Sequence, residues 1–338
     1  MTPLWDDVNA RARGLGTHLL DVTALESLGR ESDISGLAAA LRRHGVLTAA
    51  TAEVPSAEAI ELALRRWAGA MLRIIGRWAG PRVTALPLVF DDEDRRSLRA
   101  IFRGAAQRAP AMTRLAGLIP TPFLPERALE ELAHAATPEL AGSLLSAWRH
   151  PYAEAILPVT ATPQPDLLAF EVAISRAYAQ RLAAAASRSR SGAVRAFVAE
   201  SIDLENATTA LALAGNDRDI IVRETFLAGG TDLLLAGFER AIKTGTAEGA
   251  RAELRSALAR TPYATAFAPG TTWLEDELLR LRLQSLGDRV RQAPLDALTT
   301  IWFALRLRAQ LIDLQRILWT VMLNGPRAAL HDMITAAA

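Results

Sequence analysis

A short helical motif that occurs three times limits the fold of this chain more than any other sequence feature. The copies read DRRSLRAIFR from Asp94, DLENATTALALAG from Asp203 and QLIDLQRILW from Gln310, and they begin 109 and 107 residues apart. Each copy begins with an acid or amide, and a second small polar residue and an apolar residue follow three and four residues later. These polar residues are Ser97, Asn206 and Asp313, and these apolar residues are Leu98, Ala207 and Leu314. So regular a spacing indicates an internal repeat of three similar units.

A second element recurs ahead of each motif. Helical patterns that start near Ala57, Leu167 and Trp273 each contain an apolar residue followed by a glutamate and, three positions on, another apolar residue. The glutamates are Glu61, Glu171 and Glu275, and they precede their motifs by 33, 32 and 35 residues. The two helices of each unit therefore recur together.

The composition favours helices over strands. Half of the residues are hydrophobic but only 6% are aromatic, and alanine, leucine and arginine predominate. No segment has a convincing strand pattern, and residues 4–46 read as two helices. Proline clusters mark the unit boundaries. We therefore predict an all-α fold, in which N-terminal helices (1–56) complete an array of repeat unit 1 (57–160), repeat unit 2 (161–268) and repeat unit 3 (269–338).

The charge balance and the lack of cysteine exclude several classes of function. The 38 basic and 37 acidic residues leave a net charge of +1, which provides no overall field to attract nucleic acid or a membrane surface. Without cysteine there is no disulfide, thiolate metal site or cysteine nucleophile. Residues 1–7 lack the basic start of a secretory signal, so we expect a cytosolic protein. The apolar stretch Thr300–Gly325 is interrupted by Arg308 and Asp313, so it reads as a buried helix and not as a membrane span.

Motifs for bound metals or nucleotides are absent from the sequence. His18, His44, His134, His150 and His331 form no pair at helical spacing, and no glycine-rich phosphate loop or nucleophile elbow occurs. Ser187–Gly192 (SRSRSG) is a short basic loop, for which a solvated turn is favoured over a phosphate or RNA contact. Gly229-Gly230 reads as a turn leading into a helix cap. No cofactor is predicted.

One enzyme-like pattern leaves an alternative open. Asp91–Asp94 (DDED), followed downstream by Asn216, Asp217 and Glu224, resembles the paired magnesium-binding motifs of class I terpene synthases. Ile220 stands where that family has a hydroxyl or glycine, and the aromatic residues that would shield a carbocation are few. The competing interpretation places Asp91–Asp94 in the first turn of a helix, where the helix dipole favours acids.

The polar pair of the repeated motif could also form a site, because positions i and i+3 share one helix face. However, the pair changes from Asp/Ser to Asp/Asn to Gln/Asp between copies, which is unexpected for a catalytic constellation. The pattern favours a scaffold in which the pair fixes helix packing or faces solvent.

The ordered set of motifs resembles the C subunit of bacterial and archaeal V/A-type (V-type) rotary ATPases, which is similar to the eukaryotic V-ATPase d subunit. The resemblance extends over about residues 5–335. It is carried by Asn9–Arg13 (NARAR), by Asp94, Ser97, Leu98 and Arg103, by Phe170-Glu171 with Tyr178, by Ile202–Asn206 (IDLEN), by Phe226-Leu227 with Gly229-Gly230, by Thr261–Tyr263 (TPY) and by Leu311–Leu318 (LIDLQRIL). The chain departs from the family pattern at Ser97 (usually asparagine), Ala212 (usually arginine) and Gln310 (usually an acid).

This resemblance implies a non-catalytic central-stalk subunit without catalytic, cofactor or metal sites. Three pseudo-symmetric helical repeats would form a funnel that connects the rotor shaft subunits of the ATPase head to the membrane proteolipid ring and transmits torque for proton or sodium transport. The protein would sit on the cytoplasmic face of the membrane through the complex, with no membrane span of its own and no nucleic acid partner. A helical-repeat scaffold of another complex is a further alternative.

Overall fold

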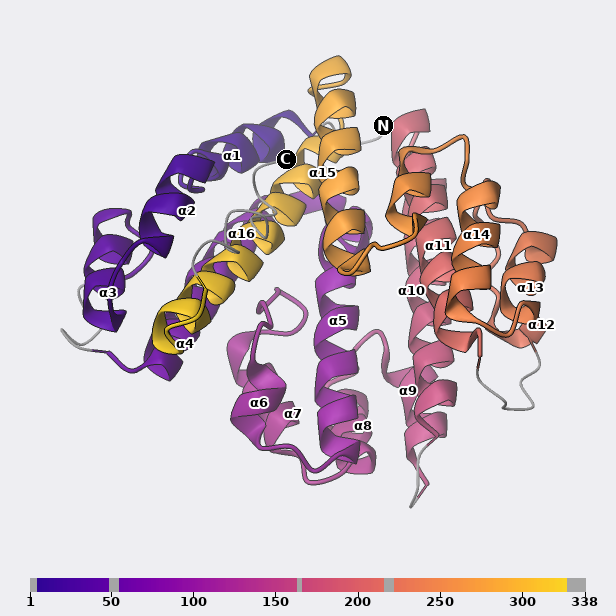
Figure 1. Cartoon of the computed structure of the whole chain (residues 1–338), viewed down its shortest axis with the longest axis horizontal. Helices are drawn as coiled ribbons and strands as arrows, with labels where there is room; N and C mark the ends of the chain where they lie inside the picture. The colour runs from indigo at the N-terminus through magenta and orange to yellow at the C-terminus, as the bar shows by residue number, and fades with distance from the viewer. Residues whose placement is uncertain (1–4, 49–54, 163–165, 216–221, 327–338) are drawn as a thin grey trace.

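The computed structural model describes residues 5–48, 55–162, 166–215 and 222–326. Within these ranges the chain forms α-helices and short 3-10 helices and no strand, which confirms the all-α prediction (Figure 1).

Three pairs of long consecutive helices, called hairpins here for the turns that join them, form the centre of the molecule, and each contains one copy of the repeated motif in its second helix. The hairpins are α4 (Ala57–Trp78) with α5 (Pro87–Ala106), α10 (Leu167–Ser187) with α11 (Gly192–Leu213), and α15 (Leu274–Gln292) with α16 (Leu298–Met322). The helices of the first pair diverge from their turn, and α4 packs along α16. The helix starts predicted near Ala57, Leu167 and Trp273 are confirmed. All three hairpins turn in the upper part of Figure 1.

Local chemistry explains where these helices begin. Ser56 accepts the N–H of Ala59 at the start of α4, and Ser191 accepts that of Val194 at the start of α11. Such caps satisfy N–H groups that have no partner inside the helix. Pro87 occupies the first turn of α5, where its fixed φ suits a helix start and its missing N–H is not needed.

A pair of short helices accompanies each motif helix. The pairs are α2 (Val22–Gly29) with α3 (Ile34–Arg43), α7 (Glu126–His134) with α8 (Pro138–Ala147), and α13 (Leu235–Lys243) with α14 (Ala247–Ala257). In every pair the second helix begins 12 residues after the first, at 34 after 22, at 138 after 126 and at 247 after 235. This common spacing supports the repeat, whose unit boundaries stay a prediction. The remaining elements are α1 (Asp6–Gly16), η1 (Gly80–Ala85), α6 (Ala111–Leu115), α9 (Ala153–Thr160), α12 (Val222–Thr225) and η2 (Pro262–Phe267).

The N-terminal segment corrects one prediction. Residues 4–46 were expected to form two helices, but the described part of this segment contains three, α1, α2 and α3. Asp21 accepts the N–H of Ala24, and Asp33 accepts the N–H of Gly36, both at 2.8 Å. These two caps divide the apolar pattern into separate short helices, which hydrophobic periodicity alone did not reveal.

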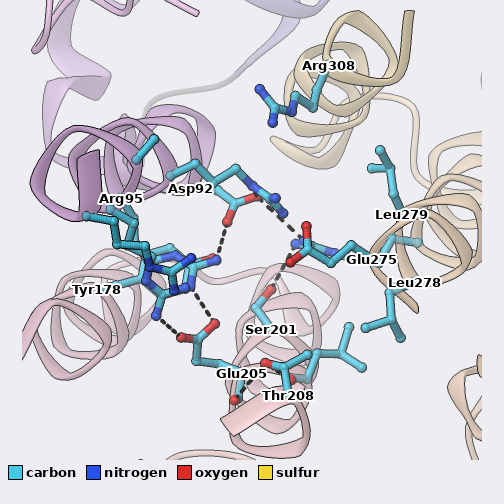
Figure 2. A pocket seen from close by; sticks show the side chains of 16 residues that line it. Asp92, Arg95, Tyr178, Ser201, Glu205, Thr208, Glu275, Leu278, Leu279 and Arg308 are labelled. Atoms are coloured by element: carbon cyan, nitrogen blue, oxygen red, sulfur yellow. Dashed lines mark hydrogen bonds and ion pairs between the residues drawn. The ribbon is translucent and has the colours of Figure 1, made fainter. Parts of the chain in front are cut away.

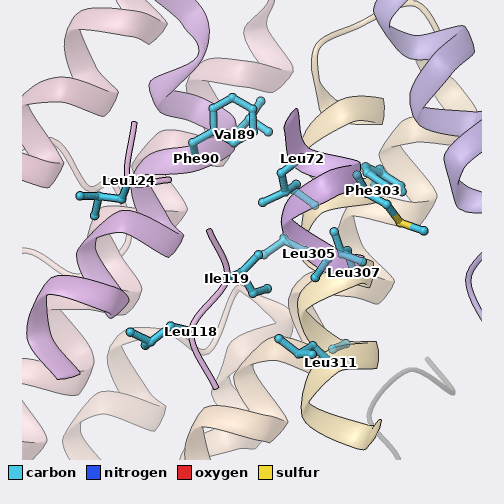
Figure 3. Close-up of a cluster of buried hydrophobic side chains, with 14 of the residues drawn as sticks. Leu72, Val89, Phe90, Leu118, Ile119, Leu124, Phe303, Leu305, Leu307 and Leu311 are labelled. Carbon is cyan, nitrogen blue, oxygen red and sulfur yellow. The ribbon is translucent and has the colours of Figure 1, made fainter. Parts of the chain in front are cut away.

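The apolar side chains form two core clusters. The larger one includes the motif residues Leu98 and Leu314 and is shown in part in Figure 3, where Leu305 points toward Ile119. The smaller one joins α11 to α13 and α14 around Phe238. The long helix α16 contributes heavily to the larger core, which confirms its interpretation as a buried helix. In the described part of the chain, no helix has the length and apolar character that crossing a membrane requires.

Candidate functional site: a charged pocket between α5, α11 and α15

A pocket of about 270 Å³ lies between the three long hairpins. Side chains from α5, α10, α11, α15 and α16 line it, as Figure 2 shows. Charged groups dominate the lining: Arg95, Arg96, Arg99, Arg103, Arg282 and Arg308 with Asp92, Glu205 and Glu275. Four of the six arginines belong to α5.

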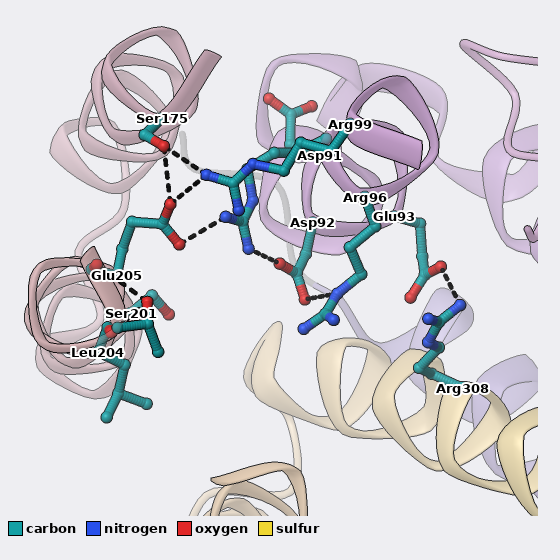
Figure 4. A network of polar contacts seen from close by, with 12 residues as sticks. Asp91, Asp92, Glu93, Arg96, Arg99, Ser175, Ser201, Leu204, Glu205 and Arg308 are labelled. Carbon is teal, nitrogen blue, oxygen red and sulfur yellow. Dashed lines mark hydrogen bonds and ion pairs between the residues drawn. The ribbon is translucent and has the colours of Figure 1, made fainter. Parts of the chain in front are cut away.

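Glu205 of α11 ties the α5 wall to its neighbours. Its carboxylate accepts hydrogen bonds from Arg95 and Arg99, each at 2.5 Å, and from the Ser175 hydroxyl at 2.7 Å (Figure 4). Burial alone would raise the pKa of Glu205, but the two guanidinium groups hold it down to about 2. The side chain is therefore an anion at neutral pH, and it joins α5 to α11 as a buried charged clamp.

Asp92 is shared by three arginines. Its oxygens lie 2.9 Å from Arg95, 3.4 Å from Arg96 and 3.7 Å from Arg282. Although burial opposes ionisation, these positive charges keep the pKa of Asp92 well below its ordinary value. One carboxylate therefore partly neutralises three guanidinium groups, and positive charge remains at this corner of the pocket.

The three glutamates of the repeated first helices have different surroundings. Glu171 forms an ion pair with Arg99 at 2.7 Å and accepts a hydrogen bond from Arg103 at 2.6 Å. Glu61 accepts the N–H of Gly117 at 3.3 Å, and burial raises the pKa of its carboxyl. Glu275 is exposed, lines the pocket and makes no ion pair within 4 Å with any residue that the structure describes. Of these three glutamates, Glu171 is the one that forms a described ion pair with a predicted motif residue, Arg103.

The first motif position binds the loop that enters a short helix. Both oxygens of Asp203 accept backbone N–H groups, from Thr231 and Asp232 at 2.9 Å and from Leu233 at 3.1 Å. A Cβ atom on Gly230 would lie 1.9 Å from Asp203 Oδ1, so only glycine fits there. The turn predicted at Gly229-Gly230 is therefore present. The N–H groups of the following residues are accepted by Asp203 of α11 and not by a side chain of the loop.

The other two copies reach an equivalent loop differently. The Gln310 side chain accepts the N–H of Leu20 at 3.2 Å. Asp94 accepts from the Thr121 hydroxyl at 2.5 Å, and that hydroxyl accepts the N–H of Leu124 at 2.9 Å. Each bonded leucine stands two residues before a short helix: Leu20 before α2, Leu124 before α7 and Leu233 before α13. This geometry supports the hypothesis that the polar pair fixes packing.

The second motif position is less uniform. Asn206 is fully buried and exchanges two hydrogen bonds with the backbone of Leu227, at 2.8 and 2.9 Å. Asp313 lies 3.8 Å from Arg316 in an ion pair. The Ser97 hydroxyl is buried and has no hydrogen-bond partner in the described structure. The apolar position that follows is buried in every copy, at Leu98, Ala207 and Leu314.

The acidic run Asp91–Asp94 is not in the first turn of a helix. Because α5 begins at Pro87, the run starts in the second turn, and three of its four residues are buried in ion pairs or hydrogen bonds. Asp91 is bound by Arg181 at 3.0 Å and by the Tyr152 hydroxyl at 3.2 Å. The first-turn interpretation is wrong because the helix begins four residues earlier, at a proline that the apolar pattern did not identify as its start.

The structure offers no support for magnesium at these acids. Burial and the charge of Asp91 raise the pKa of Asp94 well above its ordinary value, which favours a neutral acid over a metal ligand. Among the residues that are described, no three His, Asp or Glu side chains are grouped as a metal site would require. Asn216, Asp217, Ile220 and His331 lie outside the described residues.

The pocket was not predicted from the sequence, although part of its signal is present there. Arg95, Arg96, Arg99 and Arg103 follow one another at spacings that share a helix face. Their partners Glu205 and Glu171 lie far away in sequence, so the ion pairs could not be read from spacing. The basic loop Ser187–Gly192 does connect two helices, and its Ser191 caps α11.

The family model described as ATP synthase (C/AC39) subunit matches residues 8–321, which include all three motif copies. A search of curated proteins found no match.

Proposed function

Because the chain belongs to the ATP synthase (C/AC39) subunit family, whose members are non-catalytic subunits of rotary ATPases, we propose that it is the coupler of the central stalk. In this function it connects the rotor shaft subunits to the membrane proteolipid ring and transmits torque between them. The observation that carries the proposal is the family match over 8–321, which extends over all three hairpins. Both partners, and a position on the cytoplasmic face of the membrane, are parts of the proposal.

The arrangement of the hairpins suits a socket for a shaft. A second, smaller cavity of about 20 Å³ lies nearer the hairpin turns and shares Asp92, Tyr178 and Arg282 with the charged pocket. Val89, Leu182, Phe197 and Leu305, all near the turn ends of their helices, line this smaller cavity. The wider charged pocket continues along α5 from Asp92 to Arg103, away from the turns. A partner would thus enter from the end opposite the turns.

Torque transmission requires a stiff connection, and the charged clamps supply one. Glu205 connects α11 to α5 through Arg95 and Arg99. Arg308 connects α16 to α5 through Glu93 at 3.3 Å. Breaking such a buried pair is strongly unfavourable because it leaves an unpaired charge, so the three hairpins resist moving relative to one another.

The proposed subunit is built from three repeats. In this interpretation the N-terminal helices α2 and α3 complete the third unit, because Gln310 of α16 binds Leu20 ahead of α2 as Asp203 binds Leu233 ahead of α13. The boundaries 57–160, 161–268 and 269–338, with 1–56 completing the array, are part of the proposal, and this correspondence supports them.

The proposed function is tested by isolating an affinity-tagged chain from the membranes of its source cells. We expect shaft and ring subunits of a rotary ATPase to co-purify with it, and to be lost together when the complex is dissociated. An untagged strain processed in parallel is the control. If the tagged chain is recovered and no ATPase subunit co-purifies with it, the proposal is contradicted.

A further inference from the structure

The three motif helices present different chemistry at equivalent positions. Aligned by the motif, α5 has arginine at four positions where α11 and α16 have other residues. The equivalent sets are Arg95, Leu204 and Leu311; Arg96, Glu205 and Ile312; Arg99, Thr208 and Gln315; and Arg103, Ala212 and Trp319. Of the equivalent positions on the other two helices, Leu204, Glu205 and Thr208 of α11 line the pocket and none on α16 does, so the arginine wall belongs to α5 alone.

The positive charge of this wall is not fully neutralised. The sixth arginine of the pocket, Arg308, is paired with Glu93. The other five share the three carboxylates Asp92, Glu171 and Glu205, and they are Arg95, Arg96, Arg99, Arg103 and Arg282. Adding the exposed Glu275 still leaves one positive charge in surplus. An uncompensated charge in a confined pocket attracts a group of opposite sign.

Two of the arginines have unused hydrogen-bonding capacity toward the pocket. Arg96 makes only a 3.4 Å contact from its Nε to Asp92, and its side chain is 30% exposed. Arg103 is 55% exposed and is bonded through its Nε to Glu171. The Nε atom of Arg95, deeper in the wall, is buried and has no hydrogen-bond partner among the described atoms. Guanidinium groups bind carboxylates in a two-pronged geometry, which Arg96 and Arg103 leave available.

We propose that the arginine wall of α5 binds carboxylate side chains at the tip of the shaft partner. The identity of that partner rests on the proposed function. Because the four arginines of α5 all lie on one wall of the pocket, a tip with acids on one side binds with those acids toward α5. The wall thereby sets the rotational position of the shaft in the socket.

The surplus of a single charge favours a carboxylate over a more highly charged anion. Each additional negative charge would meet Glu275, Glu205 and Asp92 in the same pocket, and like charges repel strongly at such short range. The volume of about 270 Å³ is enough for a few side chains but not for a whole helix. The fitting ligand is thus the acidic end of a polypeptide.

The proposal is tested by fluorescence anisotropy with the full chain and a labelled peptide of alternating glutamate and alanine. We expect this peptide to bind and the matched lysine–alanine peptide not to bind. Arg96→Gln and Arg103→Gln should each weaken binding about tenfold, the effect of losing one charge-assisted hydrogen bond. The matched control is Arg127→Gln on α7, because Arg127 is 90% exposed and paired with Glu131 outside the pocket.

Glu275→Gln gives an opposite and therefore diagnostic change. Removing this negative charge should tighten binding of the acidic peptide by about two- to fivefold. All variants should keep the melting temperature of the parent within about 3 °C, since the altered side chains are at least partly exposed.

Several outcomes would overturn the proposal. These are equal binding of the two peptides, no binding of either, an unchanged affinity in Arg96→Gln, or weaker binding in Glu275→Gln. Displacement of the peptide by inorganic phosphate at matched ionic strength would instead assign the pocket to small anions. If the chain co-purifies with a rotary ATPase but the acidic peptide does not bind, the proposed function stands and this inference fails.

Discussion

Asp94 and Asp203 occupy the same motif position on α5 and α11, yet their surroundings differ. Three backbone N–H groups donate to Asp203, and they oppose the rise that burial causes in the pKa of its carboxyl. Asp94 accepts from one hydroxyl, that of Thr121, and burial and the nearby Asp91 raise its pKa well above the ordinary value. Burial still leaves the pKa of Asp203 raised, but this residue binds its loop directly, whereas Asp94 binds its loop through a threonine as an acid that favours the neutral form.

The first motif position thus keeps the same contact, with the loop before a short helix, although the chemical group that makes the contact changes. Gln310, an amide, makes this contact with the loop before α2. A helix position that only needs to hold a loop N–H accepts any side chain with a suitably placed oxygen. The following predictions test that view, in order of decreasing effect.

The apolar position after the polar pair should be the most sensitive, because all copies bury it alike. Leu314→Asp places an unpaired charge at a site that is 2% exposed, and we expect a loss of about 3–5 kcal/mol in unfolding free energy. Urea unfolding followed by circular dichroism measures this loss. The control Leu314→Met should cost less than about 1.5 kcal/mol. An unchanged midpoint for the aspartate variant would show that this face is not core.

The second-largest loss of stability is expected at Glu205, the residue of α11 that is equivalent to Arg96 of α5. Glu205→Gln leaves Arg95 and Arg99 without their shared negative charge, and we expect a loss of about 3 kcal/mol at pH 7. Arg127→Gln, on the outer surface, should stay within about 0.5 kcal/mol. A Glu205→Gln variant as stable as its parent would exclude the clamp.

The same clamp predicts a pH dependence. The folded-state pKa of Glu205 is about 2, below the ordinary value of 4.5, so its contribution is complete above pH 4.5 and is lost as the pH falls toward 2. Unfolding free energies measured between pH 6 and 2.5 should fall less steeply for Glu205→Gln than for the parent chain. Parallel slopes would contradict the assignment.

Asp203 and Asp94 should separate in a direct exchange for asparagine. Asp203→Asn turns an NH2 group toward backbone N–H donors, and we expect a loss of about 1–3 kcal/mol. Asp94→Asn keeps an oxygen for Thr121 and resembles the neutral acid, so its cost should stay below about 1 kcal/mol. Equal losses in thermal or urea unfolding would break the comparison.

The smallest effect is expected at Ala212, which is equivalent to Arg103. Ala212→Arg provides a guanidinium for Glu275, as Arg103 provides one for Glu171, and should change stability by no more than about 0.5 kcal/mol because Glu275 is exposed. A double-mutant cycle with Glu275→Gln measures the coupling. A coupling energy near zero would mean that α11 and α15 keep positions 212 and 275 too far apart for an ion pair.

Much of the fold could be predicted because it depends on short-range patterns. The starts of α4, α10 and α15 and the buried face of α16 follow from apolar spacing. The N-terminal helices were miscounted because two aspartate caps divide them, and a cap is a local interruption that a hydrophobic pattern does not record. The start of α5 was misjudged for a similar reason, at Pro87.

By itself, the sequence determined the all-α class, the threefold motif and the resemblance to its family. Helical periodicity depends on neighbouring residues, and the repeat spacing can be counted along the chain, so neither requires the packed structure. Only the tertiary structure decided what the charged residues do. Arg95 and Arg99 meet Glu205 about 110 and 106 positions away, and Gln310 reaches Leu20 at the other end of the chain. Whether such groups form a clamp, a loop anchor or an open arginine wall depends on burial and distance, which exist only once the helices have packed.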